Sequence, residues 1–159
     1  MQSNIRTQLK KKGSQCRYRY TGTFEKYGFK YTDRRRNHAI PTLLLLNVKD
    51  EKGIEVAEHL WFNLTKGFEA LGILQTGDIL SFNGRVKQYT KGYQGFRPGI
   101  RQTLQKDYKI ERPTKVKLEK CICQTPHQLF LKENWQKCNQ IYEKYEDDYR
   151  RRGIFKPYL

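Results

Sequence analysis

The sequence predicts a mainly β fold: a small antiparallel barrel of five strands, with a short helix between strands three and four and a helix appended at the C-terminus. Residues 42–48 form an almost continuous apolar run of strand length. A polar turn ending at Gly53 joins this run to residues 54–62, whose alternation is typical of a paired strand. Residues 127–149 lack glycine and proline and place large side chains at helical spacing.

The other elements follow from local patterns. Residues 18–24 are rich in β-favouring side chains and form the first strand, with Gly22 suited to a bulge or bend. Residues 64–72 predict the short helix, because three apolar side chains recur along one face. Apolar residues in 79–89 and 116–122 predict strands four and five.

Three parts are expected along the chain. Residues 1–14 are a flexible basic arm, residues 15–124 the barrel, and residues 125–159 the C-terminal helix with a basic and aromatic tail. Within the barrel, residues 27–41 and 90–114 predict two long loops, because glycines, prolines and charges interrupt the strand pattern there.

The net charge of +16 calls for a polyanionic partner. It comes from 32 Lys and Arg against 16 Asp and Glu in 159 residues, whereas a small soluble domain carries roughly 2 to 8 charges of either sign. The excess lies in residues 1–20, the two long loops and residues 150–159, while residues 42–80 are net negative. Aromatic side chains are abundant at 13%, unlike in a disordered basic chain. Nucleic acid is therefore the expected partner.

Several classes are excluded at this stage. No apolar run approaches the ~20 residues of a membrane-spanning helix, and no apolar stretch follows the N-terminus as in a signal peptide. We therefore expect a cytoplasmic protein without membrane association, with its four cysteines present as thiols or metal ligands.

Residues 77–86 read GDILSFNGRV, which resembles the opening of the fourth strand in many bacterial OB-fold proteins. Together with the order of elements, the resemblance to the OB-fold, a five-stranded Greek-key barrel, extends from about Tyr18 to Leu118. It implies a ligand bound across strands two and three, between the loops that join strands one to two and four to five. Those loops are the two basic segments.

The predicted function is binding of single-stranded DNA or RNA without catalysis. Arginine forks bind phosphate, and exposed rings stack on bases. The candidate contacts are Arg17, Arg19, Tyr27, Phe29, Lys30, Tyr31, Arg34, Arg35, Arg36, Trp61, Arg85, Lys87, Lys91, Tyr93, Phe96, Arg97 and Arg101. The competing interpretation is a solvated loop whose aromatic rings pack back onto the barrel. Trp61 is either a stacking platform or a core residue, because Leu60 and Phe62 must face the opposite side of the strand.

Two alternatives stay open. Cys121, Cys123, His127 and Cys138 have the side chains that bind structural zinc, although their spacing is not that of a common zinc finger and buried thiols are ordinary. No other cofactor is expected, and the histidines have no spacing that defines a nucleophile and base. The alternative function is an accessory subunit or inhibitor that docks on a ribonucleoprotein or nuclease complex, of mobile-element or phage type, as anti-CRISPR or CRISPR-associated proteins do. The docking peptide would contain Phe155, Tyr158 and Leu159.

Overall fold

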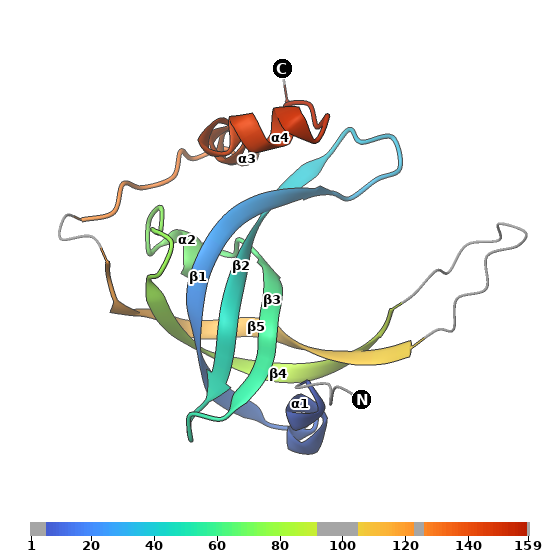
Figure 1. The fold of residues 1–159 in the computed structure, drawn as a ribbon, viewed down its shortest axis with the longest axis vertical. Coiled ribbons are helices and arrows are strands. Elements are labelled where there is room, and N and C mark those ends of the chain that lie inside the picture. Colours follow the sequence, from blue (N-terminus) through green and yellow to red (C-terminus); the bar gives the residue numbers. More distant parts are fainter. Residues whose placement is uncertain (1–5, 92–104, 123–125, 159) are drawn as a thin grey trace, which may run out of the picture.

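The computed structural model describes residues 6–91, 105–122 and 126–158, which form one five-stranded antiparallel sheet and four short helices (Figure 1). The strands are β1 (Arg17–Tyr31), β2 (Ala39–Asp50), β3 (Glu55–Asn63), β4 (Ile79–Lys91) and β5 (Gln105–Lys120). The helices are α1 (Thr7–Lys12), α2 (Lys66–Glu69), α3 (Asn134–Lys144) and α4 (Glu146–Arg151). None of the helices in these described ranges is long and apolar enough to cross a membrane.

The strands are ordered β3-β2-β1-β4-β5 and the sheet is strongly bent. In Figure 1, β1, β2 and β3 stand roughly upright side by side, while β4 and β5 run across the picture at their lower part. The two edge strands, β3 and β5, approach each other, but no hydrogen-bonded ladder joins them in the part of the chain that is described. The predicted mainly β fold, with five antiparallel strands and a helix between the third and fourth, is confirmed. The sheet is not a closed barrel.

Strand β1 changes partners along its length. Residues Arg17 to Thr23 pair with β4, and Tyr20 to Tyr31 pair with β2, so the second half of β1 has a ladder on one edge alone. The β1–β2 register shifts between Thr21 and Thr23, on either side of Gly22, where a bulge or bend was expected. A Cβ on Gly22 would lie 3.0 Å from Leu45 Cδ1, so a side chain there would press on the core.

The core is built from aromatic and aliphatic side chains on one face of the sheet. The rings of Phe62 and Phe82 lie 5.2 Å apart, edge to face, and Phe68 of α2 lies 5.6 Å from Phe62. Such tilted pairs are favourable beyond the area that they bury. The predicted short helix thus exists, and its one buried side chain is Phe68.

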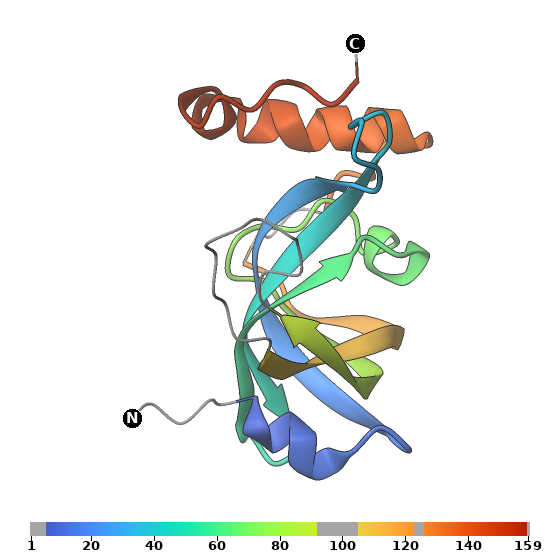
Figure 2. The same cartoon turned by 90° about the vertical axis from the view of Figure 1, so that its right-hand side faces the viewer.

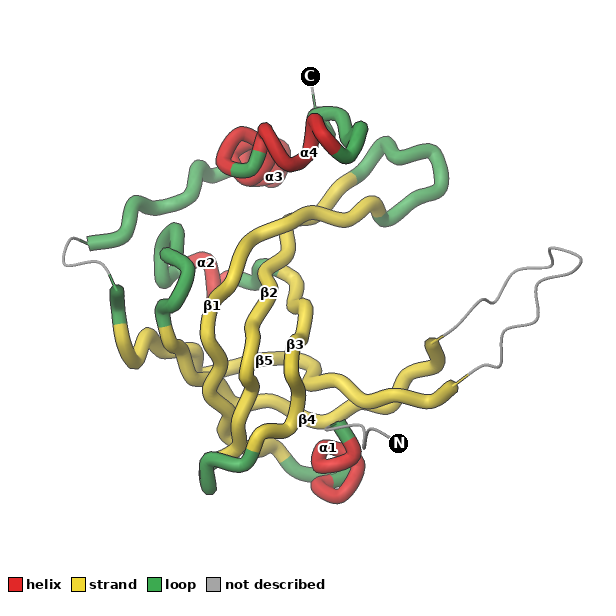
Figure 3. Tube along the Cα trace, viewed as in Figure 1, coloured by secondary structure: helices red, strands yellow, loops and turns green. Residues whose placement is uncertain are grey.

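The two long loops are shorter than predicted. Strand β1 continues to Tyr31 and β2 begins at Ala39, so the first loop is confined to residues 32–38 (Figure 3). In the second half of β1, Lys26, Gly28 and Lys30 occupy alternate positions, so the sequence lacks the pattern of β-favouring residues that predicts a strand. The apolar partners of this half-strand come from the C-terminus, since the ring of Phe29 lies 5.2 Å from that of Tyr149. Strand β5 likewise begins at Gln105, inside the second predicted loop.

The described part of the expected flexible arm is folded. Leu9 of α1 is fully buried, the Arg6 guanidinium lies 3.1 Å from the Asp107 carboxylate, and Lys12 Nζ lies 3.2 Å from Asp50 Oδ2. Because Leu9 is its one apolar residue, α1 has no hydrophobic periodicity from which the sequence could predict it. The helix is recognised only from its contacts in the folded structure. Burial opposes ionisation of Asp50, yet the N–H groups of Ile54 and Lys52 and the Lys12 ammonium lower its pKa.

The C-terminal helix also begins later than predicted. Residues 126–133 are extended, α3 begins after Glu133, and a capping box joins Glu133 to Gln136. The helical segment then divides at Tyr145 into α3 and α4. Figure 2 shows α3 running across the upper parts of β1 and β2. Two residues of α3, Cys138 and Ile141, are buried.

Because Leu9 is the buried anchor of α1, the Leu9→Ala variant is expected to lower the free energy of unfolding by about 2 to 4 kcal/mol. Urea denaturation followed by circular dichroism measures this change. Lys11→Ala, on the exposed side of the same helix, is the control and should change it by less than about 0.5 kcal/mol. Equal stabilities of the two variants would contradict a docked α1.

Candidate functional site

A row of three side chains crosses the sheet on the face opposite the aromatic core. Lys26 of β1 pairs with Leu44 of β2, and Leu44 pairs with Trp61 of β3. Trp61 is 48% exposed, whereas its neighbours Leu60 and Phe62 are 2% and 6% exposed. The structure therefore resolves the two interpretations of this strand: Leu60 and Phe62 are core, and the Trp61 indole is accessible.

A groove of about 670 Å³ runs along the second half of β1. Its lining combines aromatic rings from β1, β3 and the C-terminal helices with cationic side chains from β1, the 32–38 turn and the end of α4. The rings are Tyr27, Phe29, Tyr31, Trp61, Phe62, Tyr145 and Tyr149, of which Trp61 alone is exposed; the cations are Lys26, Lys30, Arg36 and Arg152, and Asp148 is the one carboxylate in the lining. Segments more than a hundred residues apart thus form one cationic and aromatic surface.

Glycine at position 28 leaves room for Trp61. A Cβ on Gly28 would lie 3.1 Å from Cζ3 of the indole and 3.2 Å from Thr42 Oγ1. Gly28 is in ordinary extended backbone within β1, so its role is steric and not conformational. The indole lies close against the strand backbone, and its exposed part faces the groove.

The 32–38 turn is held by Asp33. Its carboxylate accepts the backbone N–H groups of Asn37, at 3.0 Å, and His38, at 3.1 Å, and Arg36 adopts a φ of 56°. The Arg36 guanidinium lies 5.7 Å from the centre of the Tyr31 ring, within cation–π distance. Asp33 therefore orders the turn that brings Arg36 into the groove, while Arg34 and Arg35 are exposed and outside the lining.

The groove keeps an excess of positive charge. Asp148 lies 3.3 Å from Arg152, but among the described residues no carboxylate lies within ion-pair distance of Lys26, Lys30 or Arg36. Burial raises the pKa of Tyr149 to about 12, so its phenol is neutral at physiological pH and adds no negative charge.

Tyr27, an expected contact, is instead a core residue. It is 1% exposed, its hydroxyl donates to Gly72 O and accepts the N–H of Leu74 at 2.8 Å, and its ring packs edge to face on Phe130. Its own backbone N–H donates to the Tyr145 hydroxyl at 3.1 Å. The ring of Tyr27 is therefore unavailable for stacking.

The basic candidates on the β1–β4–β5 part of the sheet lie outside the groove. Arg17 donates to the carbonyl of Arg112 and to Thr114, and Arg19 donates to Asn83 at 2.9 Å. Arg85 and Lys87 lie 3.5 and 3.8 Å from the same carboxylate, that of Glu111. These cations have structural partners within the sheet. Lys91 ends β4, and Tyr93, Phe96, Arg97 and Arg101 lie outside the described residues.

The groove contains residues that sequence reasoning missed. Lys26 continues the alternation of β1, which the loop prediction for residues 27–41 obscured. Tyr145, Tyr149 and Arg152 belong to a helix and tail that are far away in sequence, and nothing local indicates that they face β1. The basic character of residues 150–159 was the one available signal for Arg152.

The three candidate zinc ligands that the structure describes lie at two separate places. Cys138 is buried in α3, with Sγ 3.7 Å from the carbonyl oxygen of Ala39, and Cys123 lies outside the described residues. Cys121 and His127 do come together, at 3.3 Å between Sγ and Nε2, and Asp78 joins them. Of the described candidates, Cys121 and His127 are thus brought together, while Cys138 lies elsewhere, and Asp78 was not among the predicted residues.

Comparisons of the chain with protein-family models, with curated proteins and with solved structures found no match. The function is therefore argued from the side chains themselves. The groove and the cluster of Asp78, Cys121 and His127 are the two sites that carry such an argument.

Burial raises the pKa of the Cys138 thiol to about 11, so at pH 8 about one molecule in a thousand carries the thiolate there. We expect Cys138→Ser to leave the number of thiols that react rapidly with Ellman's reagent unchanged. Cys16→Ser is the matched control and should remove one rapidly reacting thiol, because Cys16 is exposed. A rapidly reacting Cys138 would contradict its burial between α3 and the sheet.

Proposed function

We propose that this protein binds single-stranded nucleic acid in the groove along β1, without catalysis. The observation that carries the proposal is the lining itself: the exposed Trp61 indole, partly buried aromatic rings, and cations with no carboxylate partner among the described residues, Lys26, Lys30 and Arg36, share one groove of about 670 Å³. Proteins that bind single strands with little sequence preference combine these two features, a positive track for phosphates and rings on which bases stack.

The division of roles follows from the geometry. Trp61 offers an exposed indole against the sheet, a surface on which a base stacks whatever its identity. Lys26 and Lys30 lie four residues apart on β1, and Arg36 lies in the turn that follows the strand. These cations thus follow one strand of the sheet, as contacts to successive phosphates require.

The strand order supports an OB-like interpretation of the fold. The central position of β1, the helix between β3 and β4 and the mutual approach of β3 and β5 are the arrangement expected of a partly open five-stranded barrel. In OB-folds the ligand contacts strands two and three and the loop between strands one and two. Trp61, Thr42 and Arg36 are among the groove residues at those positions.

Trp61→Ala is expected to weaken binding of a fluorescein-labelled single-stranded oligonucleotide by about 5- to 150-fold, the value of one base stack. Fluorescence anisotropy at fixed salt, with DNA and RNA tested separately, measures this change. Trp135→Ala is the matched control, because Trp135 is equally exposed, at 49%, and lies outside the groove lining. Equal losses in both variants would remove Trp61 from the site.

The salt dependence tests the cations independently. Binding to a single strand should weaken steeply with salt, and Lys30→Ala and Arg36→Ala should each make the log–log slope shallower by about 0.7, the contribution of one phosphate contact. Lys52→Ala, in the exposed turn between β2 and β3, is the control of equal charge and should leave the slope unchanged. A wild-type affinity that is independent of salt would overturn the proposal.

The second candidate function, docking on a nucleoprotein complex, is favoured by exposed apolar side chains in the C-terminal part of the chain. Leu129 is 67% exposed, Leu131 and Trp135 are each 49% exposed, and Phe155 is 85% exposed. Tyr158, by contrast, accepts the N–H of Ala39 at 2.9 Å, and Leu159 lies outside the described residues. Absence of oligonucleotide binding below micromolar concentration, with the fold intact, would favour docking through this surface.

A further inference from the structure

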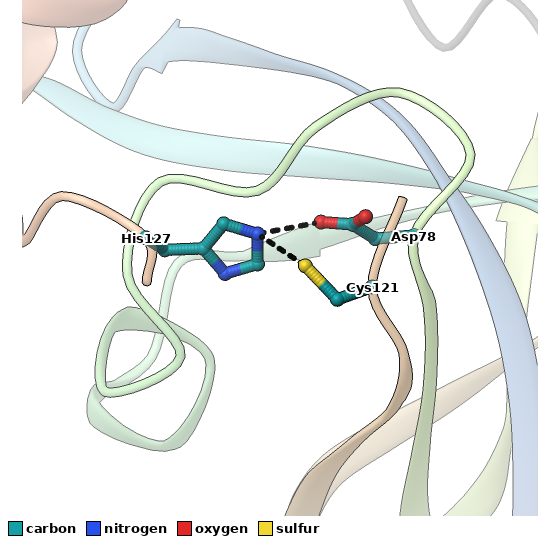
Figure 4. Close-up of side chains that lie close together, drawn as sticks. All are labelled: Asp78, Cys121 and His127. Atoms are coloured by element: carbon teal, nitrogen blue, oxygen red, sulfur yellow. Dashed lines mark hydrogen bonds and ion pairs between the residues drawn. The ribbon is translucent and has the colours of Figure 1, made fainter. Parts of the chain in front are cut away.

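Three side chains from separate segments converge beside the core, away from the groove. Asp78 stands immediately before β4, Cys121 immediately after β5, and His127 in the extended segment that leads to α3. His127 Nε2 lies 3.0 Å from Asp78 Oδ2 and 3.3 Å from Cys121 Sγ (Figure 4). The three donor atoms all lie within 4.8 Å of one another.

The orientation of the imidazole is fixed by the backbone. Its Nδ1 lies 3.1 Å from the carbonyl oxygen of Leu71, an acceptor, so Nδ1 carries the proton and Nε2 faces the other two side chains. A histidine that ligates a metal through one nitrogen commonly donates its other N–H to such a carbonyl.

The carboxylate is equally fixed. Asp78 Oδ1 accepts the N–H of Ile122 at 2.8 Å, and Oδ2 accepts the N–H of Gln75 at 2.9 Å. The side chain of Asp78 is completely buried and that of His127 is 5% exposed, whereas Cys121 lies at the surface. The cluster therefore has two preoriented buried donors and an accessible sulfur.

This arrangement is not that of a Cys–His–Asp catalytic relay. In such a relay one ring nitrogen of the histidine accepts the proton of the nucleophile, and the other ring nitrogen donates its N–H to the carboxylate. Here the thiol and the carboxylate both face Nε2, and Nδ1 is occupied by a backbone carbonyl.

With its proton on Nδ1, the neutral ring presents an Nε2 lone pair to a carboxylate and a thiol, and a doubly protonated ring has one Nε2 N–H for the two of them. A cation between the three donors satisfies all of them. Tetrahedral zinc with ordinary bond lengths separates N from O by about 3.3 Å and N from S by about 3.6 Å, within a few tenths of an ångström of the distances observed. Thiolate, imidazole and carboxylate are the ligand types of zinc. We propose that Asp78, Cys121 and His127 bind a zinc ion, with one tetrahedral position left for a further donor.

Two glycines hold the ligand segments together. At Gly72, with a φ of 80°, a Cβ would lie 2.7 Å from the Cβ of His127. At Gly77, with a φ of 102°, a Cβ would lie 3.1 Å from Cγ1 of Ile122, the residue after Cys121. Both positions favour glycine through backbone conformation and close packing. The 71–78 loop thus packs on the two segments that supply the other ligands.

Zinc at this position would cross-link the 71–78 loop, the end of β5 and the segment that leads to α3. It is therefore a structural site, and it is independent of whether the groove binds nucleic acid.

The experiment uses the full-length protein, stripped with a chelator and titrated with Zn²⁺ and with Co²⁺ as a spectroscopic substitute. We expect one equivalent of zinc by elemental analysis, a thiolate-to-cobalt charge-transfer band and a raised melting temperature. Cys121→Ser should abolish the band and weaken zinc binding at least about tenfold. His127→Gln should weaken zinc binding to a similar extent.

Cys16→Ser and Cys138→Ser are the matched controls, and both should retain the band. Because Cys121 is at the surface, its serine variant is expected to fold, which circular dichroism verifies. Less than about 0.1 equivalent of zinc in the wild type, or a band that survives in Cys121→Ser, would overturn the assignment. Asp78→Asn should also weaken zinc binding. The Cys121 variant is the decisive test, because Asp78 also accepts two backbone N–H groups and its replacement disturbs the loop as well.

Discussion

The unequal pairing of β1 is the constraint on which the rest of the structure depends. Its first half has a strand on each side, but beyond Thr23 the ladder to β4 ends while that to β2 continues. Backbone groups on the open edge need other partners. The N–H of Gly77 donates to Phe24 O, the Thr76 hydroxyl donates to Glu25 O, and Tyr145 accepts from Tyr27. Elements from distant parts of the chain thus meet along this one edge.

This edge also explains why the C-terminal helices are part of the fold. The rings of Phe29, Tyr142 and Tyr149 pack together, and Ile141 belongs to the same core as Phe24 and Leu43. The cations of this half-strand, Lys26 and Lys30, would be costly inside the core and lie instead on the solvent side of β1. The aromatic core and the charged face of β1 therefore meet beyond Thr23, where β1 no longer pairs with β4, and together they form the cationic and aromatic groove.

The elements that could be predicted from sequence are those with local signals. The apolar run of β2, the hairpin turn at Gly53 and the bend at Gly22 required no distant partner to be recognised. Helix α1 and the second half of β1 could not be predicted, because Leu9 is buried, and Phe29 partly buried, by residues far away in sequence. For the site, the residue types were predicted and Trp61 was among them. The pairing of β1 with Tyr149 and Arg152, and that of Asp78 with His127, depends on tertiary structure that the pattern does not contain.

The groove has a consequence for the order in which the protein is assembled. One side consists of residues 26–31 and 61–63, the other of residues 145–154. During synthesis on the ribosome, all five strands emerge before Tyr149 and Arg152 do, so the sheet can form while its open edge still lacks the C-terminal helices. A chain released early would retain Trp61 and the basic side of β1 without the opposite wall. The groove is therefore the last part of the fold to be completed, because it cannot form until α4 has been synthesised.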